Sequence, residues 1–81
     1  MKQYRNKENT VMAEQFSLLE TWPSGVVELT PIFRQRMYSF GTKAHHVPIH
    51  PDDWIITEES GYKWVCPDYI FERIWEEVDG A

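Results

Sequence analysis

Apolar and polar residues alternate along two neighbouring segments in the middle of this chain, which predicts a pair of β-strands. Residues 32–40 read IFRQRMYSF, and residues 43–50 read KAHHVPIH. Between them, Gly41 and Thr42 predict a tight hairpin turn in which the glycine supplies a positive φ. In an extended chain, one side of the first segment carries Ile32, Arg34, Arg36, Tyr38 and Phe40.

Two shorter strands are predicted before this hairpin. They cover residues 11–16, VMAEQF, and residues 26–29, VVEL, and the segment TWPSG at residues 21–25 predicts the loop between them. Pro31 is expected to end the second of these strands, because proline has no N–H to donate to a strand ladder. Pro48, for the same reason, indicates an edge strand or the end of strand pairing.

The most regular part of the chain is HPDDWIITEESGYKWVCPDYIF, residues 50–71. Residues 51–53 predict a turn, and residues 54–58 and 62–66 predict two strands rich in β-branched and aromatic side chains. Residues 59–61, Glu-Ser-Gly, predict the turn that joins them. This stretch therefore indicates a second hairpin.

A short helix is predicted directly after this hairpin. Pro67 and Asp68 are typical of a helix start, through the preset φ of proline and through side-chain capping. Apolar residues recur at helical spacing as far as Val78, but two glutamates near the end are unfavourable at a helix C-terminus. We therefore expect a helix over residues 67–73 and an extended segment over 74–78, with a longer helix as the alternative.

Together these elements predict an α+β, mostly β fold in one small domain over residues 1–81. We expect a curled, half-barrel-like antiparallel sheet of four to six strands with one short C-terminal helix. A chain of this length buries only about 60% of its unfolded surface. Cys66 is the only cysteine, which excludes an intrachain disulfide. Small cores usually need added support, so we expect a homo-oligomer, a dimer or a tetramer, joined through sheet edges.

Composition and charge narrow the classes of partner. Hydrophobic residues make up 42% and aromatic residues 15% of the chain, which is typical of a folded domain. The formal net charge is −5, from 13 acidic and 8 basic residues, so direct DNA binding is not expected. The polar N-terminus and the lack of a long apolar run predict a soluble, intracellular protein with no membrane partner.

Two segments carry a family resemblance. The segment HPDDWIITEESGYKWVCPDYIFERIWEEV, residues 50–78, resembles the end of small phage and prophage proteins of the PGDYG type. Their hallmarks are a PGD[WY] turn, a strand, a hairpin and a PDIFExTY-like ending. The segment YRNKENTVMAEQF, residues 4–16, is similar to the YRKKPVxVEAxQ[FW]-like opening of the same family.

The chain departs from that family pattern at two positions. Asp52 stands where the family usually has glycine, and aspartate also tolerates the left-handed backbone conformation. One additional residue separates Pro67-Asp68 from Ile70-Phe71. The resemblance implies a phage accessory protein in the host bacterial cytoplasm. It implies no enzyme class, because the family has no agreed activity.

The residues that could form a catalytic or metal site are better explained as ordinary structural or surface residues. His46 and His50 share a strand face while His45 points away, and zinc needs three or four ligands, so no metal and no other cofactor is expected. The acidic pairs Asp52-Asp53 and Glu58-Glu59 fall in predicted turns, where solvated carboxylates are ordinary. Cys66 precedes a proline at a helix start, a structural context for a buried thiol. We therefore expect a non-enzymatic protein.

Aromatic and cationic side chains offer a site for a nucleotide. Trp54, Tyr62, Trp64 and Trp75 could form a stacking surface for a base, although core packing explains any single one of them. Arginine, lysine and histidine beside them could hold phosphates. The predicted ligand-binding residues are Arg34, Arg36, Tyr38, Lys43, His45, His46, His50, Trp54 and Trp64.

Three functions fit these features. The first is counter-defence by sequestration, in which a small oligomer buries a nucleotide-derived immune signal of the host. The second is a protein inhibitor that covers a host defence or nucleic-acid enzyme with an acidic, aromatic face. The third is a minor structural or regulatory phage protein. A pocket lined by Arg34, Arg36 or a histidine favours the first, and a broad acidic face without a pocket favours the second.

Overall fold

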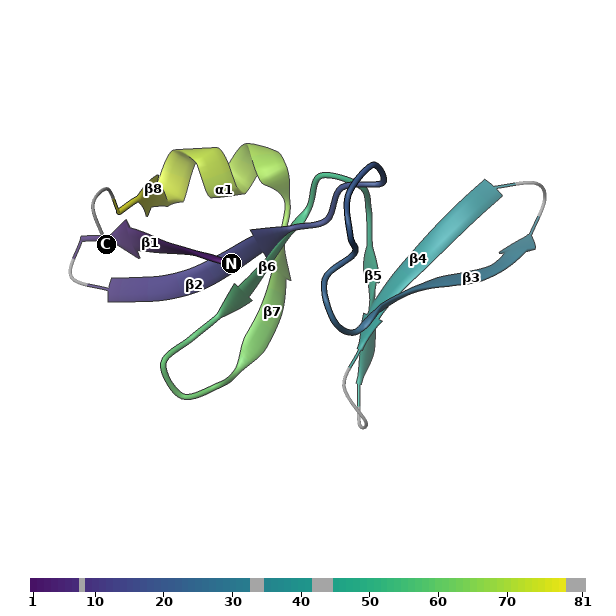
Figure 1. Cartoon of the computed structure of the whole chain (residues 1–81), viewed down its shortest axis with the longest axis horizontal. Helices are drawn as coiled ribbons and strands as arrows, with labels where there is room; N and C mark the ends of the chain where they lie inside the picture. The colour runs from purple at the N-terminus through teal and green to yellow at the C-terminus, as the bar shows by residue number, and fades with distance from the viewer. Residues whose placement is uncertain (8, 33–34, 42–44, 79–81) are drawn as a thin grey trace.

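The computed structural model describes residues 1–7, 9–32, 35–41 and 45–78. Within them it contains eight β-strands and one α-helix (Figure 1). In chain order these are β1 Lys2–Asn6, β2 Asn9–Gln15, β3 Val26–Ile32, β4 Gln35–Gly41, β5 His46–Ile49, β6 Trp54–Thr57, β7 Lys63–Cys66, α1 Asp68–Ile74 and β8 Glu76–Glu77.

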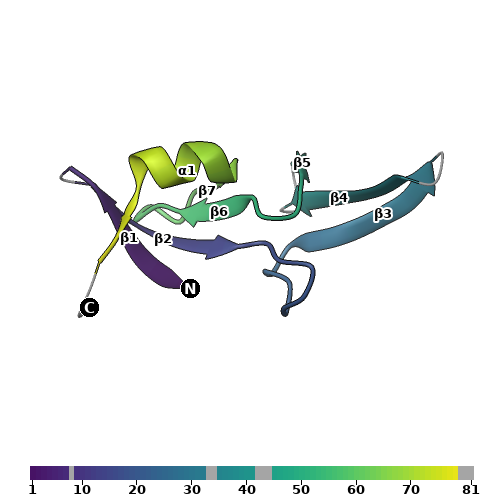
Figure 2. The same cartoon turned by 90° about the horizontal axis from the view of Figure 1, so that it is seen from above.

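The strands form two antiparallel sheets. The five-stranded sheet has the order β7-β6-β2-β1-β8, and the three-stranded sheet has the order β3-β4-β5. The chain leaves the larger sheet after β2, builds the smaller sheet, and returns as β6, which pairs with β2. The β3–β4 hairpin extends away from the rest, so that the molecule measures 43 × 25 × 21 Å (Figures 1 and 2).

This architecture confirms an α+β, mostly β fold with one short helix. The expectation of one curled, half-barrel-like sheet of four to six strands is wrong, since the described strands number eight and divide into two open sheets. The polar segment at the N-terminus, for which no strand was predicted, forms β1. It does so because Tyr4 is buried against the helix and because β1 pairs with β2 over its whole length.

One hydrophobic cluster lies between the helix and the five-stranded sheet. Phe71 of α1 stacks on Trp54 with ring centroids 4.0 Å apart, and Tyr4 meets both rings edge-on. Alternate residues of β2 and β6 complete the layer, as expected where one sheet face is covered. The buried members are Tyr4, Val11, Ala13, Ile56, Cys66 and Phe71.

A second cluster joins the two sheets. Ile55 points to the opposite face of β6 from Ile56 and packs with buried residues of the smaller sheet. Phe16, which follows β2, and Trp22, from the loop before β3, meet Tyr38 edge-on. The buried members are Phe16, Val26, Tyr38, Phe40, Ile49 and Ile55.

Proline behaves differently at its two strand positions. Pro48 lies in β5, an edge strand of the smaller sheet, as predicted. The prediction that Pro31 ends a strand is wrong, because β3 continues to Ile32 with a register irregularity after Leu29. Since β3 is also an edge strand, the missing N–H need not remove a ladder bond.

The predictions for the two turns, at Asp52 and at Gly41–Thr42, have different outcomes. Asp52 has a φ of 77°, which confirms a left-handed residue in the turn before β6. Gly41 does not have a positive φ, contrary to expectation. It is the last residue of β4, paired with His46, and a Cβ at this position would overlap the His46 ring. Thr42, the other predicted turn residue, lies outside the described residues.

The C-terminal elements follow the sequence pattern closely. The β6–β7 hairpin, the helix and the extended segment after it are all present. Pro67 is the N-cap residue, but no side chain caps the helix. The predicted capping by Asp68 is therefore wrong, because its carboxylate instead accepts a hydrogen bond of 2.8 Å from the indole N–H of Trp54.

Candidate ligand-binding cleft

A cleft of about 950 Å³ lies at the junction of the two sheets, between β5 and β7. Both are edge strands of their sheets. The lining comes from three stretches of chain: the end of β4 with β5, the turn before β6, and β7 with its flanking residues. These residues are Phe40, His45, Val47, Pro48, His50, Asp53, Gly61, Tyr62, Lys63, Trp64, Val65 and Pro67.

The walls of the cleft are largely apolar and aromatic. Phe40 and Val47 are opposite one another in the β4–β5 ladder, so both side chains lie on the same face of that sheet. Tyr62, directly before β7, is 64% exposed, and Trp64 is half-buried. Such a wall offers flat aromatic surfaces to a planar ligand.

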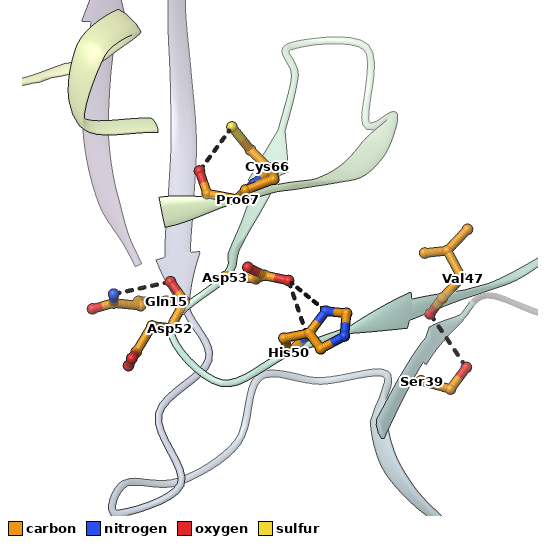
Figure 3. Close-up of polar contacts among 8 residues, drawn as sticks. All are labelled: Gln15, Ser39, Val47, His50, Asp52, Asp53, Cys66 and Pro67. Atoms are coloured by element: carbon orange, nitrogen blue, oxygen red, sulfur yellow. Dashed lines mark hydrogen bonds and ion pairs between the residues drawn. The ribbon is translucent and has the colours of Figure 1, made fainter. Parts of the chain in front are cut away.

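Four residues with charged or titratable side chains, Asp53, His45, His50 and Lys63, are among the lining residues of the cleft. The carboxylate of Asp53 accepts a hydrogen bond of 2.9 Å from the backbone N–H of His50, and it lies 3.6 Å from the ring Nδ1 of the same residue (Figure 3). The Asp53 side chain is 15% exposed, whereas that of His50 is 81% exposed. Asp53 therefore fixes the backbone at His50, and the exposed side chains of His50, His45 and Lys63 are accessible to a ligand.

Three of the predicted ligand-binding residues line this cleft. They are His45, His50 and Trp64. His46 is exposed in β5 but is not part of the lining. Arg34 and Lys43 lie outside the described residues.

The structure does not bring the other predicted residues into the cleft. Arg36 is held by Glu28, whose carboxylate lies 3.0 Å from its Nε, and this hydrogen bond and charge raise the pKa of the guanidinium. Tyr38 is buried in the cluster between the sheets. Trp54 packs on Phe71 and donates its hydrogen bond within the helix-side layer.

Sequence reasoning did not select several residues of the cleft as ligand-binding. Tyr62 was recognised only as one of a set of aromatic residues, while Lys63, Phe40 and Val47 gave no local signal. Lys63 is a polar residue alternating with apolar ones in a strand, a common pattern at any surface. Only the pairing of β6 with β2 brings β7 and β5 to the same junction.

The candidate metal-binding and catalytic residues of the described part of the chain lie in turns, in strands and in the core. There, no three histidine, cysteine, aspartate or glutamate residues lie close enough together to hold a metal ion. Asp52, Glu58 and Glu59 are exposed in turns. Cys66 is 1% exposed, and burial, together with the negative charge of Asp53, raises the pKa of its thiol.

This raised pKa predicts a loss of stability at high pH. The ordinary pKa of the Cys66 thiol is 9.0, so above that pH the unfolded chain loses the proton before the folded one. The protonated thiol therefore contributes to the free energy of unfolding. This contribution is complete below pH 9.0 and is lost as the pH rises through the higher pKa of the folded state. Urea denaturation at about pH 8 and about pH 10 measures this effect. Between these pH values the free energy of unfolding should fall less for Cys66→Ala than for the unaltered protein.

Buried Tyr4 acts in the same direction, because burial and the charge of Glu77 raise its pKa. The free energy of unfolding of Cys66→Ala is therefore also expected to fall somewhat as the pH rises. Equal declines in the two proteins would show that the Cys66 thiol is as ready to ionise in the folded chain as in the unfolded one.

A comparison of the chain with protein-family models, with curated proteins and with solved structures found no match. In the described part of the chain, the only helix is far too short to cross a bilayer.

Proposed function

We propose that this chain is a non-enzymatic phage accessory protein that sequesters a nucleotide-derived signal of host defence in the cleft between β5 and β7. The observation that supports this most directly is the composition of that cleft. Aromatic and aliphatic walls face each other across about 950 Å³, with Lys63 and two histidines beside them. Small-molecule sites typically have about 300–1,000 Å³ and a few convergent polar groups.

The two kinds of side chain suit the two parts of a nucleotide. A base can stack on Tyr62 or Trp64, since stacking needs only a flat aromatic face. Lys63, His45 and His50 can donate hydrogen bonds to phosphate oxygens. Sequestration needs this binding and no reactive group. The inhibitor hypothesis receives less support, because these two aromatic residues line a cleft and do not form a flat docking face.

Calorimetric titration with AMP and with cyclic di-AMP tests this proposal. Tyr62→Ala is expected to weaken binding about 5- to 150-fold, because stacking on an aromatic side chain contributes about 1–3 kcal/mol per base. Tyr69→Ala is the matched control: Tyr69 is 69% exposed and lies on the helix, outside the cleft. Lys63→Glu should also weaken binding, and the loss should be smaller at high salt.

Native mass spectrometry after incubation with a lysate of infected bacteria would extend the test beyond these two probes. A retained small mass that is released intact on denaturation supports sequestration. Chemical conversion of a nucleotide with turnover contradicts it. Equal effects of Tyr62→Ala and Tyr69→Ala would show that the ligand binds elsewhere.

A further inference from the structure

The three-stranded sheet has a row of exposed apolar side chains on one face. Val27 and Leu29 of β3 alternate with Val26, which is buried, and Met37 is opposite Leu29 in the β3–β4 ladder. These three side chains therefore share one face, which we call the outer face (Val27, Leu29 and Met37). They are 48%, 42% and 44% exposed, respectively.

The other face of the same sheet is covered where it meets the rest of the protein. Tyr38 and Phe40 point to that inner face and pack with Phe16 and Trp22. Neither hydrophobic cluster of the described residues includes a residue of the outer face. A sheet with one apolar face uncovered lacks the second layer that small β-domains normally have.

The distribution of charge on β3 and β4 favours a second copy of this chain as that layer. Glu28 and Arg36 lie on the inner side of the hairpin, where their side chains form an ion pair of 3.0 Å. Among the described residues of the two strands, the outer face carries no formal charge. Two copies of a protein with net charge −5 can therefore approach through this face without local repulsion.

The exposed area is also consistent with a missing partner. The accessible surface is 6408 Å². A compact monomer of 9.7 kDa is expected to expose about 5,100 Å². The excess of about 1,300 Å² exceeds the roughly 800 Å² that each partner contributes to a standard interface. The Cα radius of gyration, 13.4 Å, likewise exceeds the roughly 12 Å expected for this length.

Edge-to-edge pairing of the smaller sheet is disfavoured. Each of its two edge strands contains a proline, Pro31 in β3 and Pro48 in β5. Prolines in edge strands are a common protection against pairing with another chain, because they lack the N–H that a new ladder would need. Association through this sheet is therefore expected face to face.

We propose that the outer face is the interface of a homodimer, in which the three-stranded sheets of two copies pack on each other about 10 Å apart. The interface would bury Val27, Leu29 and Met37 of both copies. The cleft is lined by Phe40 and Val47 of the opposite face and by Pro48 of the edge strand β5. None of Val27, Leu29 and Met37 lines the cleft, so their substitution should leave ligand binding unchanged.

Sedimentation velocity over about a hundredfold range of protein concentration tests this proposal. The unaltered protein should be dimeric at the upper end, and Met37→Glu should weaken the dimer at least about a hundredfold, because it buries an unpaired charge at the interface. Met12→Glu is the matched control. Met12 is a strand methionine of similar exposure, 37%, but it lies in the five-stranded sheet. It should leave the dimer intact.

Circular dichroism and thermal melting should show that both variants fold. If Met37→Glu does not fold, Leu29→Gln takes its place, with at least about a tenfold weakening expected. A monomeric unaltered protein at all concentrations would overturn the proposal and leave the outer face to a different partner. A dimer that resists the outer-face substitutions, or that Met12→Glu also disrupts, would overturn it as well.

Discussion

Replacement of Phe71 by alanine is expected to lower the free energy of unfolding by about 3–5 kcal/mol. The Phe71 ring is 3% exposed, stacks on Trp54 at 4.0 Å and meets Tyr4 at 4.9 Å. It is also the buried residue through which α1 is held to the sheet. A chain of 81 residues typically has about 4–12 kcal/mol of total stability. The variant should therefore unfold at a much lower urea concentration.

Tyr69→Ala on the same helix provides the control. Tyr69 is 69% exposed, so its removal should change the unfolding free energy by less than about 0.5 kcal/mol. Helix propensity changes little between the two substitutions, since alanine replaces an aromatic residue in both. Equal urea midpoints for the two variants would mean that the Phe71 side chain does not anchor the helix.

Gly25→Ala is expected to cost about 2–5 kcal/mol, through two separate effects. Gly25 has a φ of +96°, which an L-residue with a Cβ adopts only with strain. A Cβ at Gly25 would also lie 2.9 Å from Cε1 of Phe40 and 3.1 Å from the carbonyl oxygen of Gly41. Because Phe40 is 4% exposed and lines the cleft, its displacement should disturb both the core and ligand binding.

Gly61→Ala separates the two effects. Gly61 has a φ of +92°, but nothing lies within 4 Å of a Cβ built there. Only the backbone strain of about 1–2 kcal/mol should remain. Urea denaturation of both variants therefore measures the steric contribution as the difference between them. If the two substitutions cost the same, the close approach of Gly25 to Phe40 has no energetic consequence.

Much of the C-terminal half was predictable because its signals are local. The β6–β7 hairpin follows from two apolar strands around Glu-Ser-Gly, and Gly61 in that turn has the positive φ that glycine favours. Pro67 begins the helix, and the two glutamates near the end lie in β8 as expected for an extended segment. Asp52 adopts the left-handed conformation that its position in the turn predicts.

The candidate site was less predictable, because exposure of a side chain depends on what packs against it. Trp54 and Trp64 are equally attractive as stacking residues in the sequence. Both side chains are half-buried against the helix-side cluster. Trp54 stacks on Phe71 of the helix, whereas Trp64, in the edge strand β7, also lines the cleft. Arg36 was expected to contact a ligand, but the pairing of β3 with β4 gives it Glu28 as a partner.

The sequence by itself determined the types and approximate limits of most elements, since hairpins, proline helix starts and left-handed turn residues depend on neighbours within a few positions. Only the tertiary structure decided that these elements form two sheets. That division rests on β6 returning to pair with β2 across about forty residues, a contact that no local pattern specifies. The two-sheet arrangement places the edge strands β5 and β7 beside the cleft and exposes Val27, Leu29 and Met37 on the smaller sheet. The cleft and the outer face are therefore consequences of long-range strand pairing.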